Sequence, residues 1–141
     1  PIRGELESLS NLWNLSDFVR FIGHETNVVN MMNALDVLVL PSVNNEDFPN
    51  VTLEAMELGK AVIASEIAGT PEQIEPGETG VLVEPGNAES LADALGRFIE
   101  DPKMSVSLGT QSRDQFYKMF KADIAVKKYM DLYDSLNAGP T

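Results

Sequence analysis

The sequence has 141 residues, enough for one domain with a buried core, and its 43% hydrophobic and 23% charged residues are ordinary for a soluble globular protein. The chain has no cysteine and one histidine, His24, which excludes disulfides, thiolate catalysis, Cys-ligated zinc and a His-rich metal site. The formal net charge of −12 argues against a basic nucleic-acid surface, so no nucleic-acid partner is expected.

Helix-like and strand-like patterns alternate along the chain. Apolar residues at helical spacing predict helices over residues 2–15, 27–34, 50–58, 88–99, 102–120 and 123–136, with a short helical piece at 71–74. Short apolar runs predict four strands over residues 19–22, 37–40, 61–64 and 81–83, and residues 137–141 are expected to form a frayed tail. Gly59 is expected to cap the helix over 50–58. The alternation predicts an α/β fold with a parallel sheet covered by helices on both faces.

Two glutamates lie eight residues apart at the predicted binding edge of this sheet. Glu46 closes a polar loop after the strand over 37–40, and Glu54 lies one turn into the next helix. An open α/β sheet binds its ligand at the carboxyl ends of its strands. A helix start offers free N–H groups to a phosphate, and the flanking carboxylates can accept hydrogen bonds from sugar or ribose hydroxyls. A nucleotide sugar combines these groups, so a ligand of that class is predicted.

Five segments in the same order resemble the retaining glycosyltransferases of family 4. The run EDFPNVTLE, from Glu46 to Glu54, resembles their E-x7-E region. The other segments are residues 19–23, 36–42, 68–72 and 77–85, which resemble their V-x-F-x-G strand, aDv…PS strand, G-x-P-E turn and G-x-x-G-x-L-V-x-P segment. Two glutamates at a given spacing often arise by chance. The match is specific because the four further segments occur with them in the same order.

The resemblance implies the fold and the domain organisation. Enzymes of this family have the GT-B fold, which consists of two Rossmann-like domains. Residues 1–141 would be a single domain that binds the nucleotide-sugar donor, a Rossmann-like parallel sheet sandwiched by helices (αβα) and a partial C-terminal domain of the GT-B fold. We expect it to be truncated at its N-terminus and to lack the N-terminal acceptor domain and a segment with Arg and Lys for the diphosphate. The alternative is a chain complete at this size, with a bare sheet edge unless a partner covers it.

The resemblance also implies roles for individual residues. Glu54 would accept hydrogen bonds from the ribose hydroxyls, and Glu46, as the catalytic residue, would contact the donor sugar and support its developing positive charge. Backbone groups that would contact phosphate and sugar belong to Phe48, Pro49, Asn50, Val51 and Thr52. Pro49 has no N–H to donate, although many members of the family have glycine there.

The base pocket and the partners are the remaining expectations. The matching base-pocket residues are Ile22, Gly23, His24 and Val28, and for His24 a surface-loop position is the alternative. No metal and no cofactor are expected. The ligand would be a UDP- or GDP-sugar, the missing N-terminal domain would be the partner, and peripheral membrane association is expected only through that domain. No apolar run is long enough to span a membrane and no signal-peptide pattern occurs, so we expect a cytoplasmic location.

The expected function is therefore donor binding within a retaining glycosyltransferase. The parent enzyme would move a sugar from a nucleotide diphosphate sugar to an unknown acceptor, which could be a glycan, a lipid or a small molecule. The isolated chain would be inactive. The alternatives are a related sugar-nucleotide epimerase or hydrolase, or a non-catalytic nucleotide-binding module. The last helix is expected to leave part of the face over 129–136 as an exposed interface.

Overall fold

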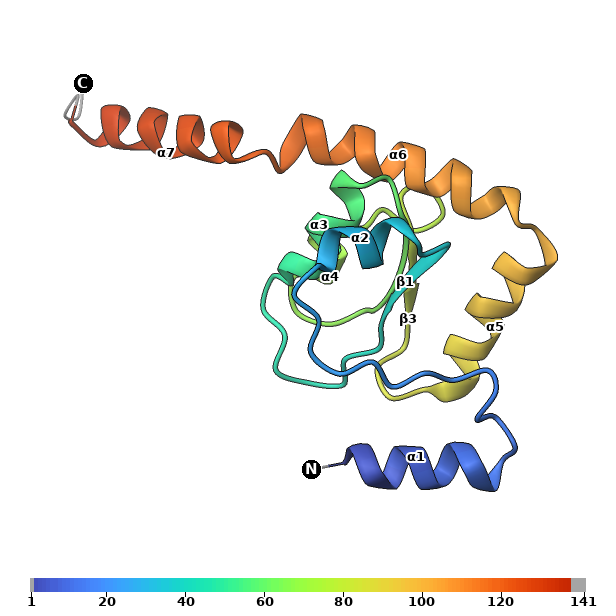
Figure 1. Cartoon of the computed structure of the whole chain (residues 1–141). Coiled ribbons are helices and arrows are strands. Elements are labelled where there is room, and N and C mark those ends of the chain that lie inside the picture. The colour runs from blue at the N-terminus through green and yellow to red at the C-terminus, as the bar shows by residue number, and fades with distance from the viewer. Residues whose placement is uncertain (1, 138–141) are drawn as a thin grey trace.

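Three apolar runs form a parallel sheet in the computed structural model, which describes residues 2–137 (Figure 1). The strands are β1 (Val37–Leu40), β2 (Ala61–Ser65) and β3 (Val81–Val83), in the spatial order β1-β2-β3. Every residue of β2 is buried, because this strand has a neighbour on each side and helices over both faces. Since all the pairings are parallel, the carboxyl ends of the three strands lie at the same edge of the sheet.

The described part of the chain contains seven helices besides this sheet. They are α1 (Arg3–Leu12), α2 (Val28–Asn33), α3 (Asn50–Glu57), α4 (Thr70–Gln73), α5 (Ala88–Glu100), α6 (Lys103–Met119) and α7 (Ala122–Asn137). Their bounds agree with the predicted helices to within a few residues, and the largest difference is that α1 ends at Leu12 instead of residue 15.

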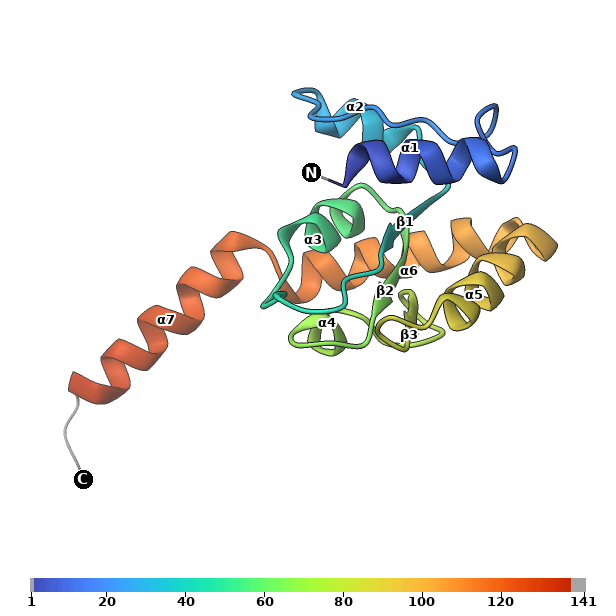
Figure 2. The ribbon, with the colours of Figure 1, turned by 90° about the horizontal axis from the view of Figure 1, so that it is seen from below.

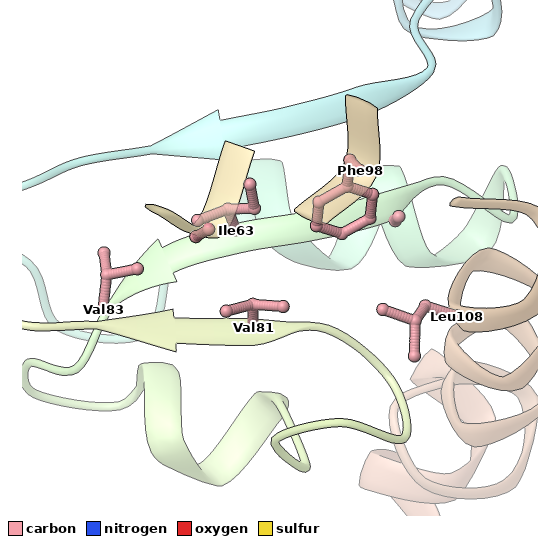
Figure 3. Close-up of a cluster of buried hydrophobic side chains, with 7 residues drawn as sticks. Ile63, Val81, Val83, Phe98 and Leu108 are labelled. Atoms are coloured by element: carbon pink, nitrogen blue, oxygen red, sulfur yellow. The ribbon is translucent and has the colours of Figure 1, made fainter. Parts of the chain in front are cut away.

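Helices α5 and α6 cover one face of the sheet. Figure 3 shows the cluster there, in which Ile63 of β2 and Val81 and Val83 of β3 pack with Phe98 of α5 and Leu108 of α6. The other face packs against α3 through a second cluster, made of Ala55, Val62, Ala64 and Ile74. The expected α/β fold, a parallel sheet between layers of helices, is confirmed.

The end of α3 is fixed by a Schellman motif at Gly59, as the sequence predicted. Gly59 has a φ of +68°, its N–H donates to the carbonyl of Met56 at 2.9 Å, and the N–H of Lys60 donates to the carbonyl of Ala55 at 2.9 Å. The ammonium of Lys60 donates to the carbonyl of Asn33 at the end of α2, at 2.8 Å. The chain therefore turns directly from α3 into β2, and this turn sets the position of α3 on the sheet.

The strand predicted over residues 19–22 is wrong, because these residues are irregular. A strand needs a neighbour to pair with its backbone groups, and among the described residues β1 pairs with β2 alone. The carbonyl of Phe21 instead accepts a hydrogen bond from Nη2 of Arg3 at 2.7 Å. The sheet of residues 2–137 thus has three strands and not four.

Helix α7 projects away from the rest of the molecule in both views (Figures 1 and 2). None of its residues is buried. Its exposed large apolar residues are Val126, Tyr129, Met130, Leu132, Tyr133 and Leu136. Asn137 belongs to this helix and not to the predicted tail, whose other residues, 138–141, lie outside the described part. None of the described helices combines the length and the apolarity needed to cross a membrane.

Candidate functional site

Glu46 lies in the loop that follows the carboxyl end of β1. The hydroxyl of Ser42 donates a hydrogen bond to Oε1 of Glu46 at 2.7 Å, and the Glu46 side chain is half-buried. Asn45, just before it, has a φ of +57°, a left-handed conformation that asparagine tolerates better than most residues. The loop therefore reverses immediately before the carboxylate, and Ser42 restricts the orientation of that carboxylate.

Helix α3 begins directly after this loop, at the same edge of the sheet. Pro49 is its N-cap residue, with φ −64° and ψ 122°, and no side chain caps the helix start. The N–H groups of Asn50, Val51 and Thr52 therefore have no intrahelical acceptor, and the positive end of the helix dipole lies beside them. Glu54 is exposed one turn further along α3. Glu46 therefore precedes these N–H groups in the chain, and Glu54 follows them by one helical turn.

Two hydrogen bonds from the segment after β2 hold the chain just before α3. The N–H of Gly69 donates to the carbonyl of Asp47 at 2.7 Å. The side-chain amide of Gln73, which is fully buried, donates to the carbonyl of Pro49 at 3.1 Å. A Cβ added at Gly69 would overlap the carbonyl oxygen of Asp47 and lie 2.8 Å from Cδ2 of Phe48. The segment 66–73 therefore fixes the start of α3 by direct contact.

The turn between β2 and α4 is itself strained and tightly bonded. Ala68 has a φ of +48°, which is unfavourable for a residue with a Cβ. The hydroxyl of Thr70 lies within hydrogen-bonding distance of the carbonyls of Ser65 and Ile67, and it accepts a hydrogen bond from the N–H of Ile67 at 3.1 Å. These bonds keep Gly69 in place beneath Phe48. The contribution of Gly69, Thr70 and Gln73 to the position of this loop was not predicted from the sequence.

The residues expected to form a base pocket lie in the segment before α2 and at the first residue of that helix. Ile22, Gly23, His24 and Val28 are all exposed. The side chain of Ile22 is 57% exposed and that of Val28 is 42% exposed. The described residues do not enclose these four positions, and their role in base binding stays a prediction.

Few positive charges lie near this edge in the sequence. Between residues 21 and 96 the only lysine or arginine is Lys60, whose ammonium is bonded to the end of α2. Residues 21–96 would therefore bind an anion at the start of α3 through N–H groups and the helix dipole, and not through basic side chains. Among the described residues no cluster of three or more His, Cys, Asp or Glu side chains could hold a metal ion.

A cavity of about 190 Å³ at the carboxyl edge of the sheet was not predicted from the sequence. It lies where the ends of the three strands meet the start of α5, and its lining includes Pro41, Ser65, Val83, Glu84 and Asn87. The only signal in the sequence was the Pro-Gly-Asn turn before the helix over 88–99, which indicates a loop and a helix cap but not a cavity.

Comparison with protein families and curated proteins gives consistent matches. The family model described as "Glycosyl transferases group 1" matches residues 3–115. N-acetyl-alpha-D-glucosaminyl L-malate synthase of Bacillus anthracis is 32% identical over 128 residues, which are 91% of this chain and 33% of that protein. A D-inositol 3-phosphate glycosyltransferase of Corynebacterium urealyticum is 31% identical over 137 residues, which are 96% of this chain and 32% of that protein. The chain spans about a third of the length of these two relatives.

Solved structures resemble the chain over most of its length. Sucrose-phosphate synthase from Thermosynechococcus elongatus matches with a TM-score of 0.84 and 35% identity, over 96% of this chain and 34% of that chain. HepE of Anabaena, in complex with UDP-glucose, matches with a TM-score of 0.82 and 26% identity, over 96% and 36%. The C-terminal domain of the glycosyl transferase group 1 protein LpcC of Francisella tularensis matches with a TM-score of 0.75 and 31% identity, over 86% and 63%.

Proposed function

The chain belongs to the family of glycosyl transferases group 1, and we propose that it is the part of a glycosyltransferase that binds the donor, a nucleotide diphosphate sugar. The observation that carries this proposal is the position of Glu46 and Glu54 on either side of the start of α3, at the carboxyl edge of a parallel sheet. A diphosphate meets N–H donors there, and hydroxyl groups on both sides of it meet carboxylates. The HepE complex with UDP-glucose supports a UDP-sugar, and a GDP-sugar is the alternative donor.

Each group at the start of α3 has a role in this proposal. The N–H groups of Asn50, Val51 and Thr52 donate to the diphosphate, while the backbone of Phe48 and Pro49 contacts the sugar. Glu54 accepts hydrogen bonds from the two ribose hydroxyls. The base lies toward the segment of Ile22, Gly23, His24 and Val28, as the family resemblance implies.

Glu46 acts on the transferred sugar. The bond between C1 of the sugar and the phosphate oxygen breaks, and its electron pair leaves with the diphosphate. The oxygen of the acceptor hydroxyl forms the new bond to C1 on the same face, so the anomeric configuration is retained, and the acceptor proton passes to the leaving phosphate oxygen. The Glu46 carboxylate, oriented by Ser42, stabilises the positive charge that develops on the sugar ring.

We propose that residues 1–141 form one donor-binding domain of a larger protein. The chain spans about a third of its relatives, so the acceptor domain and the basic groups that a diphosphate requires are assigned to other parts of the protein. The chain alone is then expected to bind a nucleotide without transferring sugar. Formation of a glycoside from UDP-glucose by this chain alone, in an assay with a panel of sugar and lipid acceptors, would contradict that expectation.

The test is NMR mapping of UDP, GDP and ADP at millimolar concentration on the ¹⁵N-labelled chain. One nucleotide is expected to shift the amide signals of Asn50, Val51 and Glu54 selectively, and Glu54→Gln is expected to weaken its binding. Glu57→Gln, an exposed change at the other end of α3, is the matched control and should have no effect. Absence of shifts with all three nucleotides, or shifts confined to other elements, would favour a binding module of another kind.

A further inference from the structure

The cavity at the carboxyl edge of the sheet is lined by Ser65, a residue with a hydroxyl group. Ser65 is 2% exposed, and among residues 2–137 its side chain makes no hydrogen bond, although its carbonyl accepts one from Thr70. Because side chains alternate along a strand, Ser65 of β2 lies on the same face as Ile63, toward α5. The hydroxyl of Ser65 is therefore available to a ligand in this cavity.

Fixed polar groups of the β3–α5 turn form the rim of the cavity. The amide of Asn87 donates to Oε2 of Glu84 at 2.7 Å, and no other side chain or backbone group of residues 2–137 donates to Oε1 of Glu84. Oδ1 of Asn87 accepts from the N–H groups of Glu89 and Ser90, at 3.1 Å and 3.0 Å, and so caps α5. Gly86 has a φ of +74° and completes the turn. These bonds hold a carboxylate acceptor in a defined position before any ligand binds.

The remaining wall of the cavity is apolar and comes from Pro41, Val83 and Leu91. A pyranose ring has an apolar C–H face and hydroxyl groups at its edge, and this cavity presents the complementary surfaces in a volume of about 190 Å³. Its one charged lining group is the Glu84 carboxylate, which would repel a phosphate or a carboxylate ligand. Pro41 is followed by Ser42, which orients Glu46, so the cavity lies on the same sheet edge as the proposed donor site.

We propose that this cavity binds a neutral hexose ring, with Ser65 and Glu84 as hydrogen-bonding partners of its hydroxyls. The proposal rests on the proposed function, since the ring belongs either to the sugar of the donor or to a sugar of the acceptor. Ser65 and Glu84 bind this ring and take no part in the cleavage of the donor.

The test is NMR titration of the ¹⁵N-labelled full chain with UDP, with UDP-glucose and with the methyl α-glycosides of glucose, galactose, mannose and N-acetylglucosamine. At least one sugar-containing ligand is expected to shift the backbone amide signals of Ser65, Glu84 and Asn87. UDP alone should leave these signals unchanged. Ser65→Ala and Glu84→Gln should each weaken this sugar-dependent effect by about fivefold, the loss of one hydrogen bond. Glu89→Gln, an exposed change in the first turn of α5, is the control and should leave it unchanged.

The outcomes separate this inference from the proposed function. Shifts with a methyl glycoside that persist when UDP-glucose is bound assign the ring to the acceptor, and shifts that UDP-glucose alone produces, or that it displaces, assign the ring to the donor. If no ligand of the series shifts these amides, or if Ser65→Ala and Glu84→Gln behave like Glu89→Gln, the inference is overturned. The effect of UDP at the start of α3 is measured in the same titrations, so failure of the donor site is detected independently. Ser65→Ala removes an unpartnered hydroxyl and is expected to fold.

Discussion

The side-chain amide of Gln73 reaches across 24 residues of sequence to the carbonyl of Pro49, the N-cap residue of α3. Both residues are buried, and the bond joins the short helix α4 to the place where the proposed phosphate site begins. A second bond, from the N–H of Gly69 to the carbonyl of Asp47, acts on the same loop. The segment after β2 thus positions the start of α3, and this relationship can be tested apart from any contact with the ligand.

Gln73→Leu removes the donor to Pro49 and should lower the free energy of unfolding by about 0.5–1.5 kcal/mol, because the carbonyl of Pro49 loses one hydrogen bond. It should also weaken nucleotide binding, which calorimetry with UDP measures. The control is Ile63→Val, a core change expected to cost about 1 kcal/mol without touching the loop. Equal UDP affinity of Gln73→Leu and Ile63→Val would show that Gln73 contributes to stability alone.

Gly69→Ala places a Cβ against the carbonyl of Asp47 and the ring of Phe48. We expect a loss of about 1–3 kcal/mol in stability, typical of overpacking, together with weaker nucleotide binding because the loop must move. Gly96→Ala in α5 is the matched control, since nothing lies within 4 Å of its added Cβ. That change should raise stability by up to about 1 kcal/mol. Chemical denaturation measures the free energy of unfolding of both variants. Similar changes in this free energy for Gly69→Ala and Gly96→Ala would argue against close packing at Gly69.

Ala68→Gly should stabilise the chain by about 0.5–1 kcal/mol, because Ala68 has a φ of +48° and a glycine adopts this conformation without strain. The change adds no side-chain atom and leaves the neighbouring bonds of Thr70 in place. Thermal unfolding measures the difference. A lower melting temperature for Ala68→Gly would mean that the left-handed conformation is not the one populated in solution.

Deletion of residues 122–141 should leave the stability of the remaining domain within about 0.5 kcal/mol of the full chain, because no residue of α7 is buried. UDP affinity should also be unchanged, since α7 projects away from the start of α3 (Figure 2). Chemical denaturation and calorimetry of the shortened chain are the measurements. A large loss of stability would show that α7 packs on the domain.

The sequence predicted the strands well where an apolar run is bounded on both sides by turn residues, and β1 and β3 have the predicted bounds. It was wrong for residues 19–22, because an apolar run shows the tendency to form a strand but does not show whether a partner strand is present. The position of Glu46 and Glu54 near the start of α3 followed from chain order. The bond from Gln73 to Pro49 did not, since nothing local in the sequence links a side-chain amide in α4 to a carbonyl 24 residues earlier.

The measurement that tests the central claim most directly is a double-mutant cycle between Glu54 and the ribose, with UDP and 2′-deoxy-UDP as ligands for the original chain and for Glu54→Gln. If Glu54 accepts a hydrogen bond from the 2′-hydroxyl, the original chain should bind UDP about tenfold more tightly than 2′-deoxy-UDP, and Glu54→Gln should lose most of this preference. Glu57→Gln should keep it. An undiminished preference for UDP in Glu54→Gln would contradict the ribose role of Glu54 and, with it, the assignment of the donor site to the start of α3.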